Sequence, residues 1–401
     1  MPASHHVFSF RTDSFLKSLL LKHAGNTGKE ILKKAGEYKL QIIYILIDRD
    51  AGNNPSFQEY HYHVNPESYF YPASTVKMPI AFTALEKLNK ISFPGLNRDT
   101  PLFAGSFYRT IPDQPDDTFR DGLSVAQYIK EIFLVSNNDA SNMLYEFIGQ
   151  QELNQLLHKK GYEKMHILHR LDIALTEAQN RDTAAISFRK NGETIYSQPP
   201  RYSQLKYPVR EDFIGKGYIE DGKLIPHAMA FSMKNKAVLS DLIHILQSVI
   251  FPGSVPSFRR FDLSAEDFQF LYRWMSAYPQ ESGDPQYDST SFPPGYVKFL
   301  LPEEANHGHI RVFNKSGWAY GFMTDVAYIA DFRNSVEFML AATLYANRDD
   351  IPNGEHYEYE TIAKPFLKEL GKIIYQYELN RERKYLPDLS RYNLSYEEDP
   401  L

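Results

Sequence analysis

The chain of 401 residues contains no cysteine, which excludes disulfide bonds, thiolate metal sites and a cysteine nucleophile. It also contains no apolar run as long as a membrane span, since the apolar stretch Leu40–Ile47 has only the length of a strand. The first residues have neither the basic start nor the apolar core of a signal peptide. We therefore expect no membrane span, and either a cytoplasmic location or a signal peptide that is missing from this sequence.

An excess of basic residues is absent as well. Lysine and arginine number 44 against 50 aspartates and glutamates, so the net charge is −6. Because no dense basic stripe offsets this charge, we expect no nucleic-acid partner. Aromatic residues are plentiful by contrast, with 28 tyrosines and 27 phenylalanines, and we expect aromatic side chains to line the pockets.

Strand-like segments occur at both ends of the sequence, and helical periodicity fills the middle. Leu40–Asp48 is a predicted strand, and Glu59–Val64 is its predicted hairpin partner. The predicted C-terminal strands are Ile310–Lys315, Met323–Asp331 and Val336–Tyr345. The predicted helices are Thr12–Glu37 with a break at Gly25–Gly28, Ser74–Asn89, Leu123–Val135, Ala140–Ile148, Gln151–Lys159, Lys236–Ile250, Ala265–Tyr278 and Tyr357–Tyr377.

This order predicts an α+β fold, in which an antiparallel sheet built from both chain ends is flanked by helices and an all-helical lobe is inserted. Residues 1–66 and 305–401 are assigned to the sheet lobe, and residues 67–304 to the helical lobe. Within the helical lobe, residues 184–230 have little periodicity and are interpreted as a long insertion. The charged last residues are expected to form a mobile tail. The cleft between the lobes is the natural ligand site.

Three short motifs carry the residue types of a serine acyl-transfer enzyme. Ser74-Thr75-Val76-Lys77 places a hydroxyl and an amine on one helical face. Ser136-Asn137-Asn138 lies on a predicted interhelical loop, and Lys315-Ser316-Gly317 ends a predicted strand. Ser-x-x-Lys alone is common, since Ser14–Lys17 and Ser203–Lys206 also match it and are simply interpreted as solvated side chains. The other two motifs each occur once, so the combination favours a shared site.

A serine hydroxyl is a weak nucleophile at neutral pH and needs a base beside it. Lys77 can serve as that base only if its amine is partly neutral, so burial and a nearby cation should lower its pKa. Lys315 is the candidate for that cation. Backbone N–H groups aimed at the developing oxyanion would contribute about 10²–10³ in rate each. The motifs therefore predict covalent catalysis at Ser74 without a metal or cofactor.

With these motifs the chain resembles the penicillin-recognising serine hydrolases, and within them the class A β-lactamases. The resemblance extends roughly over residues 40–377, without the insertion and parts of Gln280–His309. Arg170–Ala178 looks like the ω loop of the family, and Arg181-Asp182-Thr183 looks like its end. Family enzymes begin this loop with Arg-x-Glu, and the glutamate activates the hydrolytic water.

The resemblance implies five catalytic residues. Ser74 would be the acylated nucleophile, Lys77 would accept or relay its proton, and Ser136 would pass a proton to the leaving nitrogen. Lys315 would supply positive charge for the substrate carboxylate and for the Ser136 hydroxyl. Asp172 stands where the family has the glutamate that activates water.

The resemblance also implies four substrate-binding residues. Asn138 would donate its amide to a carbonyl of the substrate side chain, and Ser316 would hydrogen-bond the substrate carboxylate. Gly317 would leave room for the ligand, and the backbone N–H groups of Ser74 and Trp318 would form the oxyanion hole. The implied substrate is a small β-lactam or a peptidoglycan-like peptide, and the implied protein is a monomer in the periplasm or outside the cell.

Two departures from the family pattern concern deacylation. Asp172 is one methylene shorter than the family glutamate, and a misplacement of about 1 Å can cost on the order of 100-fold in rate. Thr176 replaces an asparagine that helps to hold the water in the family. Glu177 is a rival carboxylate, and Arg170 and Asp182 are expected to pair and close the loop. The sequence therefore predicts ready acylation and slow deacylation.

Other interpretations remain open. A D,D-peptidase or related amidase would use Ser74 and Lys77 without a dedicated deacylation carboxylate, and a degenerate domain would bind penicillin or cell-wall peptides as a non-catalytic sensor. Asp172 and Arg170 could alternatively form only a structural ion pair. His61 and His63 alternate along one strand, and solvated side chains are expected there rather than a metal site.

Overall fold

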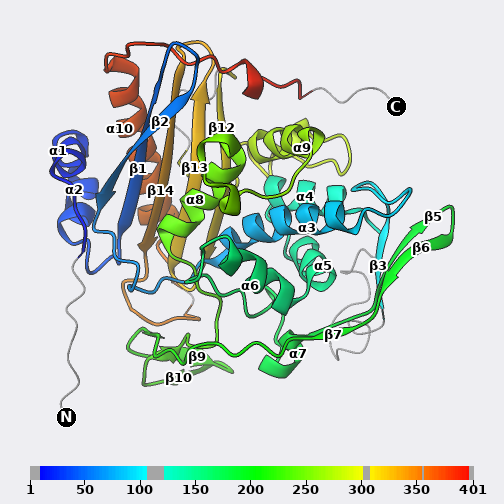
Figure 1. The fold of residues 1–401 in the computed structure, drawn as a ribbon. Helices are drawn as coiled ribbons and strands as arrows, with labels where there is room; N and C mark the ends of the chain where they lie inside the picture. Colours follow the sequence, from blue (N-terminus) through cyan, green and yellow to red (C-terminus); the bar gives the residue numbers. More distant parts are fainter. Residues whose placement is uncertain (1–9, 106–121, 301–307, 355, 397–401) are drawn as a thin grey trace.

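The computed structural model describes residues 10–105, 122–300, 308–354 and 356–396. Its centre is a five-stranded antiparallel sheet with the strand order β12-β13-β14-β1-β2 (Figure 1). As the sequence predicts, the strands come from both ends of the chain: β1 (Gln41–Arg49), β2 (Pro55–Tyr62), β12 (Ile310–Ala319), β13 (Phe322–Asp331) and β14 (Val336–Tyr345). Strand β12 lies at one edge, so some of its backbone N–H groups face away from the sheet.

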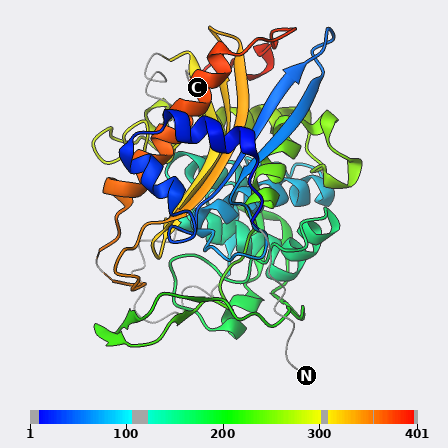
Figure 2. The same ribbon diagram turned by 90° about the vertical axis from the view of Figure 1, so that its left-hand side faces the viewer.

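Strand β1 is buried on both faces, which explains its continuous apolar run. Ile43 and Ile45 pack toward the helical region, whereas Tyr44 and Leu46 pack toward the terminal helices. These terminal helices cover the outer face of the sheet (Figure 2). They are α1 (Ser14–His23), α2 (Asn26–Lys33) and α10 (Lys364–Asn380).

The opposite face of the sheet packs against the helical region, whose central helix is α3 (Lys77–Ile91). Every residue from Lys77 to Leu88 is buried, because other elements surround the helix. The other helices of the region are α4 (Val125–Leu134), α5 (Asn138–Ile148), α6 (Gln150–Lys159), α7 (Glu177–Arg181), α8 (Leu239–Ile250) and α9 (Ala265–Ser276). Over the part of the chain that the structure describes, none of the helices is long and apolar enough to cross a membrane.

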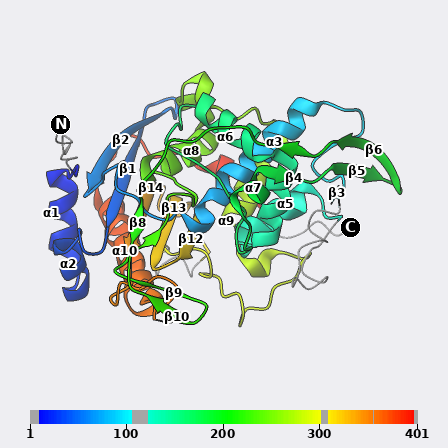
Figure 3. The same cartoon turned by 90° about the horizontal axis from the view of Figure 1, so that it is seen from below.

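The part of the chain between β2 and β12, which was predicted to be all-helical, also contains strands. Short antiparallel strands run along one edge of it, from β9 and β10 near the sheet to β5 and β6 at the far end (Figures 1 and 3). Their pairs are too short to show a clear period of two in the sequence. They are β3 (Leu102–Ala104), β4 (Asp182–Thr183), β5 (Ile186–Lys190), β6 (Glu193–Gln198), β7 (Arg201–Tyr202), β8 (Phe213–Ile214), β9 (Tyr218–Glu220), β10 (Lys223–Ile225) and β11 (Met229–Ala230).

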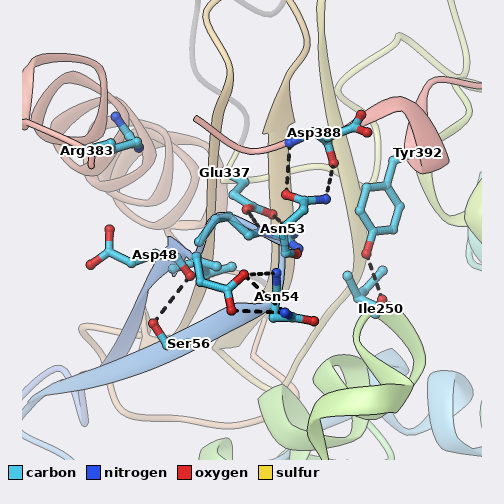
Figure 4. Close-up of polar contacts among 12 residues, drawn as sticks. Asp48, Asn53, Asn54, Ser56, Ile250, Glu337, Arg383, Asp388 and Tyr392 are labelled. Carbon is cyan, nitrogen blue, oxygen red and sulfur yellow. Dashed lines mark hydrogen bonds and ion pairs between the residues drawn. The ribbon is translucent and has the colours of Figure 1, made fainter. Parts of the chain in front are cut away.

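The expectation of a mobile C-terminal tail is wrong for residues 381–396, and residues 397–401 lie outside the described residues. Tyr392 is buried, and its hydroxyl donates to the carbonyl of Ile250 over 2.8 Å. Asp388 exchanges two hydrogen bonds with the side chain of Asn53 in the β1–β2 turn, at 3.0 and 3.1 Å (Figure 4). These contacts, together with the ion pairs of Arg381 and Arg383 to Glu378, hold a segment whose composition is mostly polar.

Candidate active site

Ser74 and Lys77 lie on one continuous turn that leads into α3. Ser74 is the second residue of the 3₁₀ turn Ala73–Val76, and Lys77 is the first residue of α3. Ala73 has φ = 46°, in the left-handed region that L-residues rarely adopt. Ser74 remains half-buried, while the neighbouring residues of the turn and Lys77 are buried. The turn therefore leaves Ser74 partly exposed, whereas Lys77, three residues later, is buried.

Strand β12 lies directly against this turn at Gly317. A Cβ atom at position 317 would lie 2.5 Å from the backbone nitrogen of Ser74, 2.8 Å from that of Thr75 and 3.0 Å from the carbonyl oxygen of Pro72. Real Cβ atoms do not approach backbone atoms so closely, so only glycine fits. Lys315 lies two residues earlier on the strand, on the same face as Gly317.

Two lysine amines converge on the hydroxyl of Ser136. Lys315 Nζ donates to Ser136 Oγ over 2.9 Å, and Lys77 Nζ approaches the same oxygen at 3.3 Å. Lys77 Nζ also donates to Asn138 Oδ1 over 2.6 Å and to the backbone carbonyl of Ser136. Side chains from α3, the α4–α5 loop and β12 therefore meet in one place.

Burial changes the protonation of both amines. It lowers the pKa of Lys77 well below its ordinary value, the nearby Lys315 lowers that pKa further, and Asp172 and Asp139 oppose the shift. Burial also lowers the pKa of Lys315 to about 7, against the opposing effect of Asp325. Two amines whose pKa values are lowered, placed beside the same Ser136 hydroxyl, are suited to proton transfer.

The α4–α5 loop holds Ser136 and Asn138 in place through its own hydrogen bonds. Ser136 has φ = 59°, and Asn137 caps α5 by accepting from the backbone N–H of Ala140 over 3.0 Å. The Asn137 amide donates to Glu131 Oε2 over 2.8 Å. Capping fixes the start of α5, so Asn138 enters the site as the first residue of that helix.

The ω-like loop brings Asp172 to this group. Asp172 is exposed, has φ = 58° and accepts a hydrogen bond from Asn138 Nδ2 over 3.2 Å. Glu177, the rival carboxylate, is paired with Arg181 at 2.8 Å. Thr176 caps the short helix α7, and its hydroxyl donates to Gln179 Oε1 over 2.9 Å.

The expected closure of this loop by Arg170 and Asp182 requires a correction. The buried Arg170 guanidinium forms its ion pair with Glu146 of α5, and its Nε donates to Glu146 Oε1 over 2.5 Å. Its hydrogen bond to Asp182 goes to the backbone carbonyl, also over 2.5 Å. Glu146 additionally accepts from the backbone N–H of Ala184 over 2.8 Å, so one buried carboxylate connects both ends of the loop.

Ser316 and Trp318 lie on β12, but their side chains do not join the cluster around Ser136. Ser316 is completely buried, and its hydroxyl donates to the carbonyl of Val297 over 2.6 Å. The Trp318 ring packs edge-on against Tyr296 and Phe299. Alternation along the strand places these two side chains opposite Lys315 and Gly317.

Another buried lysine, whose charge acts on Lys315, was not identified from the sequence. Lys298 Nζ donates to the carbonyls of Met275 and Val312 over 2.8 Å each and to Asn314 Oδ1 over 3.0 Å. Burial lowers the pKa of Lys298 to about 7, and Lys298 in turn lowers the pKa of Lys315. The sequence does contain a sign of this burial, because Lys298 is the one charged residue in the apolar run that begins at Val297.

The expectation of solvated histidines on β2 is wrong for His61. Its ring is buried, with Nε2 at 2.6 Å from Glu59 Oε1, and His244 Nε2 lies 2.8 Å from the other oxygen of Glu59. His63 Nδ1 lies 3.1 Å from the carbonyl oxygen of Leu40. No group of three metal-ligating side chains is placed to hold an ion in the described ranges.

Comparison with known proteins supports the resemblance. A sequence model of the beta-lactamase enzyme family matches residues 29–198. The fold is similar to the crystal structure of the chromosome-encoded beta-lactamase of Vibrio parahaemolyticus, with a TM-score of 0.50 and 12% identity over 88% of this chain and 98% of that one. It is also similar to the beta-lactamase from Desulfarculus baarsii DSM 2075, with a TM-score of 0.51 and 13% identity over 93% and 100% of the two chains. No curated protein matches the sequence.

Proposed function

Since the chain resembles the penicillin-recognising serine hydrolases in sequence and has the β-lactamase fold, we propose that it is a serine hydrolase that opens β-lactams through an acyl-enzyme on Ser74. The observation that carries the proposal is the convergence of the Lys77 and Lys315 amines on Ser136 Oγ, beside the contact between Gly317 and Ser74. The proposed substrate is a small β-lactam, and the proposed location is the periplasm or the cell exterior.

In the proposed acylation, Lys77 takes the proton of the Ser74 hydroxyl while the Ser74 oxygen attacks the lactam carbonyl carbon. The carbonyl becomes an oxyanion beside the backbone N–H groups of Ser74 and Trp318, which stabilise it. When the carbonyl re-forms, the C–N bond breaks. The leaving nitrogen takes the proton of Ser136, which regains one from Lys77. Lys315 attracts the substrate carboxylate and polarises the Ser136 hydroxyl.

In the proposed deacylation, Asp172 takes a proton from a water molecule while the water oxygen attacks the ester carbonyl carbon. The bond between that carbon and Ser74 Oγ then breaks, and the proton is returned to Ser74 Oγ. The short side chain of Asp172 reaches less far than a glutamate would, and its exposed position keeps it solvated. The Thr176 hydroxyl and the Glu177 carboxylate are both engaged within α7. Slow release of the acyl group is therefore the expected behaviour.

The same observation favours a second candidate, a D,D-peptidase-like enzyme that penicillin inactivates. Such an enzyme would be labelled stably at Ser74, whereas a β-lactamase would turn over. Hydrolysis of nitrocefin, a chromogenic cephalosporin, together with labelling by a fluorescent penicillin distinguishes the two functions.

Ser74→Ala should abolish both nitrocefin hydrolysis and fluorescent labelling. Ser14→Ala is the matched control, because Ser14 begins another Ser-x-x-Lys sequence on the exposed helix α1. Labelling that persists in Ser74→Ala would remove Ser74 as the nucleophile. If the folded wild-type protein is not labelled at all, both enzymatic functions are excluded and the non-catalytic sensor is the interpretation that remains.

A further inference from the structure

The N-terminal helices α1 and α2 form an outer layer of the molecule, on the side of the sheet that faces away from the helical region (Figures 2 and 3). Their inward side chains, among them Leu16, Leu20 and Ile31, are buried in the core on that side of the sheet. Lys315 shares the opposite face of β12 with Phe313, which packs toward the helical region. A partner that covers α1 and α2 would therefore not cover the proposed catalytic groups.

The segment that contains these two helices is basic. Residues 10–39 contain seven lysines and arginines against three aspartates and glutamates, whereas the whole chain has a net charge of −6. The segment thus carries +4 and the rest of the sequence −10. Helix α1 contains no acidic residue at all. An acidic protein therefore presents positive charge on one outer face, which is the arrangement that attracts an anionic partner.

Four lysines carry this charge without an acidic partner among the described residues. They are Lys17 and Lys22 on α1 and Lys29 and Lys33 on α2. All of them except Lys29 are exposed. Glu30, the acidic residue of α2, is paired with Lys34 at 3.1 Å and does not neutralise them. These ammonium groups remain hydrated and available to anions at the surface.

An apolar groove lies beside the basic helices. It has a volume of about 760 Å³ and runs between α1 and α10. Leu19 of α1 lines one side, and Ile373 and Tyr377 of α10 line the other. Leu19 and Tyr377 are only half-buried, so the groove exposes part of their apolar surface to solvent. Apolar area and positive charge therefore occur next to each other on this face.

The charges in the groove do not oppose an anionic ligand. The lining groups that can carry charge are His23, Glu369, Lys372 and Arg381. Glu369 Oε1 accepts from the backbone N–H of Gly25 over 2.6 Å, at the start of α2, so the helix dipole offsets its charge. Arg381 is paired with Asp48 at 2.6 Å. The other two lining groups are cations when they are protonated. The groove therefore suits an apolar chain that is attached to an anionic headgroup.

We propose that α1 and α2 dock on a bilayer that contains anionic phospholipids, and that the groove between α1 and α10 takes one acyl chain. A cluster of four lysines on amphipathic helices lies within the range that is typical of such docking surfaces. The apolar contact adds a contribution that salt does not screen. This proposal is independent of the proposed acylation of Ser74, because the docking face and the catalytic groups lie on opposite faces of the sheet.

The test is co-sedimentation of the full chain with two kinds of vesicle. One kind contains phosphatidylcholine alone, and the other contains phosphatidylcholine with an equal part of phosphatidylglycerol. We expect binding to the mixed vesicles to be at least about tenfold tighter. It should weaken as the salt concentration rises, because salt screens the lysines from the headgroups. Equal binding to both kinds of vesicle would overturn the proposal.

Two double variants locate the docking face. Lys22→Gln with Lys33→Gln should weaken binding to the mixed vesicles about 25-fold, which is about fivefold for each lysine. Lys159→Gln with Lys190→Gln is the matched control, because these exposed lysines lie on α6 and β5, away from α1 and α2 (Figure 1). The control should bind as the wild type does. An equal loss in both double variants would overturn docking through α1 and α2.

The groove is tested by Leu19→Ser, which removes apolar area and leaves every lysine in place. It should weaken binding about fivefold at low and at high salt alike. Leu19→Ala replaces it if that variant does not fold, and wild-type binding in the folded variant would overturn the role of the groove. Binding of soluble glycerol phosphate as tight as that of the vesicles would assign the lysines to a free phosphate ester and overturn the bilayer. Labelling at Ser74 by fluorescent penicillin should be the same in all these variants, so a failure of docking leaves the proposed function intact.

Discussion

The backbone of Gly317 lies so close to the backbone nitrogen of Ser74 that a methyl group on residue 317 would sit 2.5 Å from that nitrogen. This contact joins the edge strand of the sheet to the turn that bears the proposed nucleophile. It fixes the distance between residues that lie 243 positions apart in the chain.

Gly317→Ala should therefore lower the rate of acylation by about 100-fold, because the strand must shift by a fraction of an ångström to an ångström. The measurement is the rate of labelling by fluorescent penicillin, with thermal unfolding followed in parallel. Gly36→Ala is the matched control, since no atom lies within 4 Å of a Cβ at that position. An unchanged labelling rate in Gly317→Ala would show that the contact has no catalytic importance.

Acylation should weaken as the pH rises above about 7. Burial lowers the pKa of Lys315 to about 7, so the amine is charged below that pH and loses its charge above it. Above pH 7 the second-order rate constant should fall by up to about tenfold per pH unit, because neutral Lys315 no longer attracts the substrate carboxylate. In Lys315→Arg this fall should disappear, since arginine stays charged. A wild-type rate that is constant between pH 7 and 9 would contradict the assignment.

Asp172→Asn should trap the acyl-enzyme, because an amide cannot take a proton from water. We expect deacylation to slow by about 100-fold or more while acylation stays within a few-fold. Asp172→Glu should accelerate deacylation if reach is the limiting factor. Glu177→Gln is the control, and accumulation of acyl-enzyme in that variant instead would transfer the role of base to Glu177.

Glu146→Gln should destabilise the protein strongly. The Arg170 and Glu146 side chains are completely buried, and removing one partner leaves a buried charge that typically costs about 3–5 kcal/mol. Glu177→Gln breaks a partly exposed pair with Arg181 and should cost less than about 1 kcal/mol. Urea unfolding of both variants measures the difference, and similar small losses would show that Glu146 does not hold the loop.

The sequence predicts the fold well where the pattern is local. The periodic spacing of apolar residues predicts the long strands and the helices. The strands β4–β11 were not predicted, because they are too short for such a spacing to show. The three sequence motifs predicted a shared site, and in the structure Lys77 and Lys315 both contact Ser136.

Contacts made across the fold could not be predicted in this way. Glu146 lies in the middle of α5 with no local signal of its partner, and the resemblance implied Asp182 as the partner of Arg170 instead. The C-terminal segment is held by contacts with elements distant in sequence, among them the buried ring of Tyr392 and the ion pair between Arg381 and Asp48.

The most direct test of the account follows the intact mass of the protein over time after mixing with a limited amount of benzylpenicillin. We predict that one equivalent of intact penicillin is added, that peptide mapping places it on Ser74, and that the mass returns slowly to that of the free protein. If no adduct forms in the folded protein, or if the adduct lies on another residue, the proposed chemistry is contradicted.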